Sequence, residues 1–85
     1  MADLVASDQL IEGLVEIFAS VLPGVEIDAD SDLFDLGGHS IVAGQVVARA
    51  REILDIPVSL RDVFTARTPR GIVEAVDRRA PLPRR

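Results

Sequence analysis

The 85 residues include no cysteine, tryptophan, tyrosine or lysine, and only three phenylalanines. The absence of cysteine excludes disulfide bonds, thiolate metal sites and a cysteine nucleophile. A stacking platform for single-stranded nucleic acid requires several aromatic side chains, so that function is not expected either. The core must be built from aliphatic side chains, and the length predicts one small domain.

Arginine is missing from the first 40 positions, which hold nine of the fourteen acidic side chains. All nine arginines lie in residues 41–85, and the net charge is −5. A protein that binds a nucleic-acid backbone presents a basic surface, so the charge argues against such a partner. We interpret the basic C-terminal arginines as a solvated tail: Arg78, Arg79, Arg84 and Arg85.

Long apolar runs are also absent. The N-terminus is acidic rather than basic and lacks the apolar stretch of a secretory signal. No segment approaches the roughly 20 apolar residues that span a bilayer. We therefore expect a cytoplasmic protein that does not bind membranes.

Apolar residues recur at helical spacing, and no segment alternates as a strand does. The pattern predicts helices over 7–22 and 40–54, a short helix opened by a Ser59 capping box, and a last helix that starts at Thr68-Pro69. The fold class is all-α: a small four-helix bundle of three main helices and one short one, with a long loop over 23–39. The expected boundaries are a tail over 1–6, a domain over 7–79 and a tail over 80–85.

The residues expected to face the core share an apolar side chain at the right spacing. They are Leu10, Ile11, Leu14, Phe18, Val21 and Leu22 in the first helix, Val42, Ala43, Val46, Val47, Ala50, Ile53 and Leu54 in the second, and Ile72, Val73 and Val76 in the last. The long loop has its own apolar residues, which should pin it to the core: Val25, Ile27, Leu33, Phe34 and Leu36. Residues 32–36 could form one helical turn.

Ser40 follows two glycines at the start of the second long helix. A serine in that place is most simply an N-cap. On a helical wheel of about 100° per residue, Ile41 points away from the core and forms a weakly apolar strip with Gln45 and Ala48. The strip is either a tolerated exposed surface or a docking strip for partner proteins. Free N–H groups at the helix start would stabilise a phosphate ester on the hydroxyl, which favours a modified serine.

The spacing of the residues argues against two other functions, serine-hydrolase catalysis and calcium binding. His39 is the immediate neighbour of Ser40 and is poorly placed as its base, and Val42 stands where a Gly-x-Ser-x-Gly elbow needs glycine. A calcium loop starting at Asp28 would need glycine and glutamate where Leu33 and His39 stand. We interpret the five acids of the long loop as a solvated, mutually repelling surface, and we expect no metal site.

The segment Asp32-Leu33-Phe34-Asp35-Leu36-Gly37-Gly38-His39-Ser40-Ile41 resembles the phosphopantetheine attachment motif of peptidyl carrier proteins, the thiolation domains of nonribosomal peptide synthetases. Val63-Phe64 and the helix start at Thr68-Pro69 resemble the C-terminal half of that family. The resemblance covers roughly residues 7–77 and implies an acyl-carrier-protein-like fold.

The resemblance implies that Ser40 holds a covalent 4′-phosphopantetheine whose thiol carries aminoacyl or peptidyl groups as thioesters. The protein would catalyse nothing itself and would act as a monomer. Its partners would be a phosphopantetheinyl transferase, an adenylation enzyme, and condensation, tailoring or thioesterase enzymes. The surface expected to contact them comprises Leu36, Gly37, Gly38, His39, Ile41, Gln45, Ala48 and Val63.

The second long helix contains one internal acid, Glu52, and two arginines, Arg49 and Arg51, which favours the peptidyl type over the acidic second helix of fatty-acid carriers. Three alternatives remain open: an acyl carrier of a polyketide or hybrid pathway, an aryl carrier of a siderophore pathway, and a helical interaction module in which Ser40 is only a cap.

Overall fold

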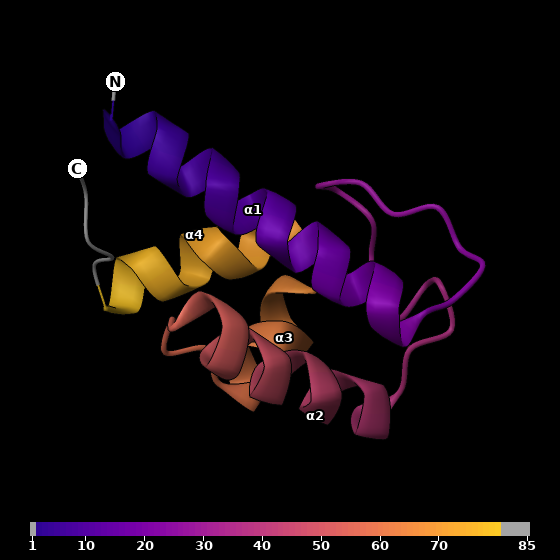
Figure 1. Cartoon of the computed structure of the whole chain (residues 1–85). Coiled ribbons are helices and arrows are strands. Elements are labelled where there is room, and N and C mark those ends of the chain that lie inside the picture. Colours follow the sequence, from indigo (N-terminus) through magenta and orange to yellow (C-terminus); the bar gives the residue numbers. More distant parts are fainter. Residues whose placement is uncertain (1, 81–85) are drawn as a thin grey trace.

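The computed structural model describes residues 2–80 (Figure 1). Four α-helices and one π-helical turn follow one another in the order α1 (Ala2–Val21), α2 (Ser40–Arg49), η1 (Ala50–Leu54), α3 (Leu60–Ala66) and α4 (Pro69–Arg79). No strand occurs within the described residues, and the predicted four-helix, all-α class is confirmed. Helix α1 packs against α4 and α2, and α3 packs against α2 and α4.

The two ends of the bundle hold different features. The first turn of α2, where Ser40 lies, is at the opposite end of the bundle from the last turn of α4 (Figure 1). The long loop between α1 and α2 runs at the same end as Ser40. Among the helices of residues 2–80, none has the length and apolar character that a bilayer span requires.

Helix α1 starts earlier than predicted, at Ala2 rather than Ser7, so neither Ser7 nor Asp8 is its N-cap. The segment predicted as an N-terminal tail has no glycine or proline before position 13, and helix formers such as alanine and leucine allow the helix to continue through it. The helix ends before Pro23, and Gly24 adopts a left-handed φ of 83°. Residue 1 and residues 81–85, with Arg84 and Arg85, lie outside the described part of the chain.

The core lies where the four helices meet, and most of its predicted members are confirmed. Leu14, Phe18, Val46 and Ile72 are fully buried, and Leu33 anchors the long loop among them. The other apolar loop residues pack partly against this core: Val25, Ile27, Phe34 and Leu36. Ile17 was not predicted and is buried, because α1 contacts both α2 and α4 and therefore buries a wider stripe than a single neighbour would require.

Ile53 is the one predicted core residue of the second helix that the structure places outside, with 64% of its surface exposed. The α-helix changes at Ala50 into the π-helix η1, in which hydrogen bonds join residues five apart. Each residue then turns the chain by less than in an α-helix, so Ile53 rotates out of the buried arc. Leu54 still packs partly on the core, and Asp55 ends the turn with a left-handed φ of 54°.

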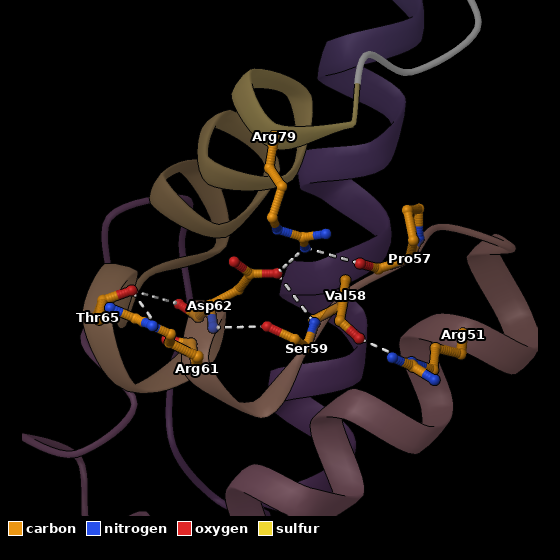
Figure 2. A network of polar contacts seen from close by, with 8 residues as sticks. All are labelled: Arg51, Pro57, Val58, Ser59, Arg61, Asp62, Thr65 and Arg79. Atoms are coloured by element: carbon orange, nitrogen blue, oxygen red, sulfur yellow. Dashed lines mark hydrogen bonds and ion pairs between the residues drawn. The ribbon is translucent and has the colours of Figure 1, made fainter.

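A polar network fastens α3 to the last turn of α4 (Figure 2). The predicted capping box is present: the Asp62 N–H donates to Ser59 Oγ (3.1 Å), and the Ser59 N–H donates to Asp62 Oδ2 (2.9 Å). Arg79 donates from α4 to Asp62 and also to the Pro57 carbonyl oxygen. Arg78 and Arg79 are exposed as predicted, but they are not part of a tail: both belong to α4, where positive charge in the last turn complements the helix dipole.

Candidate functional site

Ser40 is the first residue of α2 and not its N-cap. His39 occupies the N-cap with an extended backbone, and its side chain makes no capping hydrogen bond. The first bond of the ladder runs from the Ala43 N–H to the His39 carbonyl oxygen (2.8 Å), which leaves the three preceding N–H groups without an intrahelical acceptor. No acidic residue lies in this first turn, so it is suited to an anionic group such as a phosphate.

The Ser40 side chain is exposed, as the interpretation of a modified serine requires. Its hydroxyl takes part in no hydrogen bond among residues 8–80, whose side chains the structure describes. The hydroxyl therefore has no structural task in the described chain and is accessible to another protein. His39 is exposed beside it and is likewise unbonded through its side chain, which gives Ser40 no general base of its own.

The turn before Ser40 is built around the Asp32 side chain. Asp32 Oδ1 accepts from the N–H groups of Phe34 (2.9 Å) and Asp35 (3.1 Å), and the Asp32 carbonyl oxygen accepts from Leu36 (3.2 Å). These bonds form the single helical turn predicted for residues 32–36.

The two glycines of the motif have different tasks. Gly37 adopts a φ of 100°, which side-chain-bearing residues rarely tolerate. Gly38 donates its N–H to the Leu33 carbonyl oxygen (2.8 Å), and a Cβ at this position would lie 2.7 Å from that oxygen and from Leu33 Cγ. Gly37 therefore supplies the reversal, and Gly38 supplies the room for the chain to return past Leu33 to Ser40.

The predicted partner surface is partly corrected. Ile41 is 70% exposed, and Gln45 and Ala48 are exposed beside it on α2. Gly37 and His39 are exposed as well, while Leu36 and Gly38 are half-buried. Val63 is fully buried in the core and cannot contact a partner.

Helix α3 instead exposes Leu60 and Phe64, which were not predicted as surface residues. The spacing of these two large apolar residues, four positions apart, places them on one face of the helix and away from Val63. That spacing is the only signal in the sequence, and α3 is too short to repeat it as a periodic pattern.

The acids of the long loop do not form the repelling surface that we expected. Asp30 pairs with Arg70 of α4 (2.9 Å), and Asp32 pairs with Arg67, the residue that follows α3 (2.7 Å). The hydrogen bond from Arg70 is the main reason why the pKa of Asp30 lies below its ordinary value. For Asp32, partial burial raises the pKa, but Arg67 and the two backbone N–H donors outweigh it and the pKa is lowered. Among the described side chains of residues 8–80, no three histidine or acidic groups gather as metal ligands.

Residues 12–76 match the model of a protein family described as "phosphopantetheine attachment site". The chain belongs to this family. The match includes the whole loop, the two glycines and Ser40, and it extends through α4 to the buried Val76. The exposed serine at the start of α2 thus lies within a phosphopantetheine attachment domain.

Known relatives agree with this assignment. The domain is 41% identical over 70 residues to PF 1022-synthetase of Rosellinia sp., a match that covers 82% of this chain and 2% of that protein. It is 35% identical over 83 residues to the probable non-canonical nonribosomal peptide synthetase CymA of Salinispora arenicola, covering 98% of this chain and 1% of that protein. The attachment domain therefore spans only a small part of these curated relatives.

The fold also matches a solved structure, that of BlmI, a type-II acyl-carrier-protein from Streptomyces verticillus involved in bleomycin biosynthesis. The TM-score is 0.77 at 27% sequence identity, covering 86% of this chain and 88% of BlmI. The acyl-carrier-protein-like fold is confirmed. The attachment domain is therefore homologous to a segment of nonribosomal peptide synthetases and has the fold of a carrier protein.

Proposed function

We propose that Ser40 carries 4′-phosphopantetheine through a phosphodiester, and that the domain is a peptidyl carrier. The observation that supports this most is the exposed, unbonded Ser40 hydroxyl at an uncapped helix start, inside the segment that matches the attachment family. The N–H groups of the first turn of α2 would face the phosphate and balance its charge. When bound, the prosthetic group supplies a thiol that holds aminoacyl or peptidyl groups as thioesters.

The domain needs an enzyme to install this group. Loading forms a bond from Ser40 Oγ to the phosphorus next to the pantetheine arm, breaks the pyrophosphate bond of coenzyme A and releases adenosine 3′,5′-bisphosphate. The Ser40 hydroxyl loses its proton in this step, and the neighbouring His39 makes no hydrogen bond that would accept it. A phosphopantetheinyl transferase would supply both the base and the contact with coenzyme A. The described chain then has only to present the hydroxyl and to neutralise the phosphate.

Transient contacts fit the partners we propose: adenylation, condensation, tailoring and thioesterase enzymes. A carrier must leave each enzyme after each reaction, so every interface should be small. Ile41, Gln45 and Ala48 give α2 such a weakly apolar strip, and Leu60 and Phe64 add two exposed apolar side chains on α3. Tethering compensates for weak binding because the substrate reaches each active site at a high effective concentration.

A mass measurement tests the attachment. The purified protein is incubated with coenzyme A, Mg²⁺ and a phosphopantetheinyl transferase of broad specificity that loads a known carrier in parallel. We expect the intact mass to increase by one phosphopantetheine group. An unchanged mass beside a fully loaded reference carrier would contradict the proposal and leave the interaction module as the alternative.

Ile41→Asp should impair loading by partner enzymes without unfolding the domain. The side chain is 70% exposed, so the expected change in the free energy of unfolding is within about 0.5 kcal/mol. Ile53→Asp is the matched control, because Ile53 is a similarly exposed isoleucine on η1, which follows the last residue of α2 whereas Ser40 is the first. Aminoacylation rates and urea unfolding are measured for both variants. Equal rates in the two variants would contradict a docking role for the strip.

A further inference from the structure

Arg67, the residue that joins α3 to α4, has an unusual backbone. Its φ is 70°, a left-handed value that a residue with a side chain rarely adopts. Both backbone polar groups are used there: its N–H donates to the Val63 carbonyl oxygen (3.0 Å), and its carbonyl oxygen accepts from the Leu33 N–H (2.9 Å). The left-handed junction thus directs a carbonyl oxygen of the α3–α4 link at the long loop.

The Arg67 side chain contacts the same loop. Nε donates to Asp32 Oδ2 (2.7 Å), and Nη2 lies 3.8 Å from Asp35 Oδ1. The guanidinium carbon is 5.2 Å from the centre of the Phe34 ring, within the range of a cation–π contact. Phe34 in turn stacks on Phe64 of α3, with ring centres 5.2 Å apart and planes inclined by 11°.

These contacts continue toward Ser40. The oxygen of Asp32 that does not bind Arg67 accepts the N–H groups of Phe34 and Asp35, and so fixes the helical turn. Leu33, whose N–H is bound by the Arg67 carbonyl oxygen, accepts the Gly38 N–H on its own carbonyl oxygen. Backbone hydrogen bonds therefore run from the Arg67 carbonyl oxygen through Leu33 to Gly38, two positions before Ser40. The Arg67 guanidinium joins the same turn separately, through the Asp32 carboxylate.

We propose that Arg67 is a positioning residue for the attachment reaction. It holds the turn of residues 32–38 against α3 and thereby sets where Ser40 is presented. This inference rests on the proposed attachment at Ser40. The neighbouring residue Arg70 binds an earlier part of the loop: its side chain pairs with Asp30, and its N–H donates to the Ala29 carbonyl oxygen. In the described structure Arg70 forms no hydrogen bond with residues 32–38.

The variant Arg67→Gly tests the contribution of the Arg67 side chain separately from that of its backbone. Glycine adopts the φ of 70° freely and keeps the backbone N–H and carbonyl oxygen, so only the guanidinium contacts are lost. Arg70→Gln is the matched control, because it removes one positive charge and one exposed ion pair from the same loop. The Asp30–Arg70 pair is exposed and the Asp32–Arg67 pair is partly exposed, so each contributes little to the global stability and both variants should stay folded at the assay temperature.

The first measurement is the initial rate of phosphopantetheine transfer against carrier concentration. If only a fraction of the carrier presents Ser40 correctly, the apparent affinity falls by that fraction while the turnover of bound carrier is unchanged. For Arg67→Gly we expect KM for the carrier to rise about fivefold with kcat unchanged, and for Arg70→Gln a KM within about twofold of the wild type. A merely structural role would leave KM unchanged as long as the protein is folded.

The second measurement is amide hydrogen exchange at Gly38, which requires no loading. We expect Gly38 to exchange about tenfold faster in Arg67→Gly, relative to the core amide of Val46, and to be unchanged in Arg70→Gln. Unchanged KM and unchanged exchange in Arg67→Gly, or equal changes in both variants, would overturn the positioning role alone. A wild type that gains no mass would overturn the proposed attachment and the positioning role with it.

Discussion

Ser40→Ala will abolish the mass increase that the wild type shows with coenzyme A and a phosphopantetheinyl transferase. Alanine has no oxygen to form the phosphodiester. The variant should fold normally, because the Ser40 hydroxyl makes no hydrogen bond in the described structure and alanine is a good residue in a first helical turn. We expect the free energy of unfolding to change by no more than about 0.5 kcal/mol.

The control for this variant is Ser31→Ala. Ser31 lies in the same loop, and its hydroxyl accepts from the Asp28 N–H (2.8 Å), so the substitution removes a local contact but should leave loading complete. The mass of a tryptic peptide cannot identify the loaded serine. The chain has no arginine or lysine before Arg49, so the peptide that contains Ser40 also contains three other serines, and variants are needed to distinguish them. Loading that persists in Ser40→Ala would show that another residue accepts the group.

Asp62→Ala should have the largest effect on stability among the polar substitutions. Asp62 is only 7% exposed, and its carboxylate accepts from the Ser59 N–H and from Arg79. The variant loses half of the capping box and leaves the Ser59 N–H without its partner, which together should cost about 2 kcal/mol. Urea unfolding measures the difference, and Glu12→Ala, an exposed acid on α1, should change stability by less than about 0.5 kcal/mol.

The pH dependence of the free energy of unfolding shows how much of the Asp62 contribution comes from its negative charge. Burial raises the pKa of Asp62, but the hydrogen bonds from Ser59 and Arg79 outweigh it, and the pKa lies below the ordinary value of 3.8. A carboxylate with a lowered pKa in the folded state stabilises fully above its unfolded pKa and loses that contribution as the pH falls through the folded value. The gap between wild type and Asp62→Ala should therefore be constant above about pH 5 and shrink as the pH falls below 3.8. A gap that keeps its size down to the acid transition would show that the ion pair contributes nothing.

Features that depend on neighbouring residues were predictable from the sequence. The Ser59 capping box and the start of α4, where Thr68 Oγ1 accepts from the Gly71 N–H (3.0 Å), both follow from residues three positions apart. The outward orientation of Ile41 followed from helical periodicity, because α2 is a regular α-helix over all of its ten residues. The attachment motif placed Ser40 after a turn, and that turn has the expected position.

Features that depend on hydrogen-bond register or on distant partners were not predictable. Periodicity assumes a constant turn per residue, so it could not show that the chain changes to a π-helix at Ala50 and exposes Ile53. The pairs of Asp30 with Arg70 and Asp32 with Arg67 join residues 40 and 35 positions apart, and no local pattern indicates them. Arg79 likewise lies 17 positions from Asp62, beyond the reach of any local pattern, so the sequence does not indicate its role.

The first turn of α2, which holds Ser40, and the last turn of α4, which holds Arg79, lie at opposite ends of the bundle (Figure 1), and this separation bears on how such a domain can be engineered. Substitutions on the exposed surface near Ser40 should therefore leave the hydrogen bonds between α3 and α4 in place. The exposed residues of α2 and the preceding loop can therefore be exchanged for those of another carrier without changing the Asp62–Arg79 contact. Swapping specificity between assembly lines then becomes a task separate from preserving the scaffold.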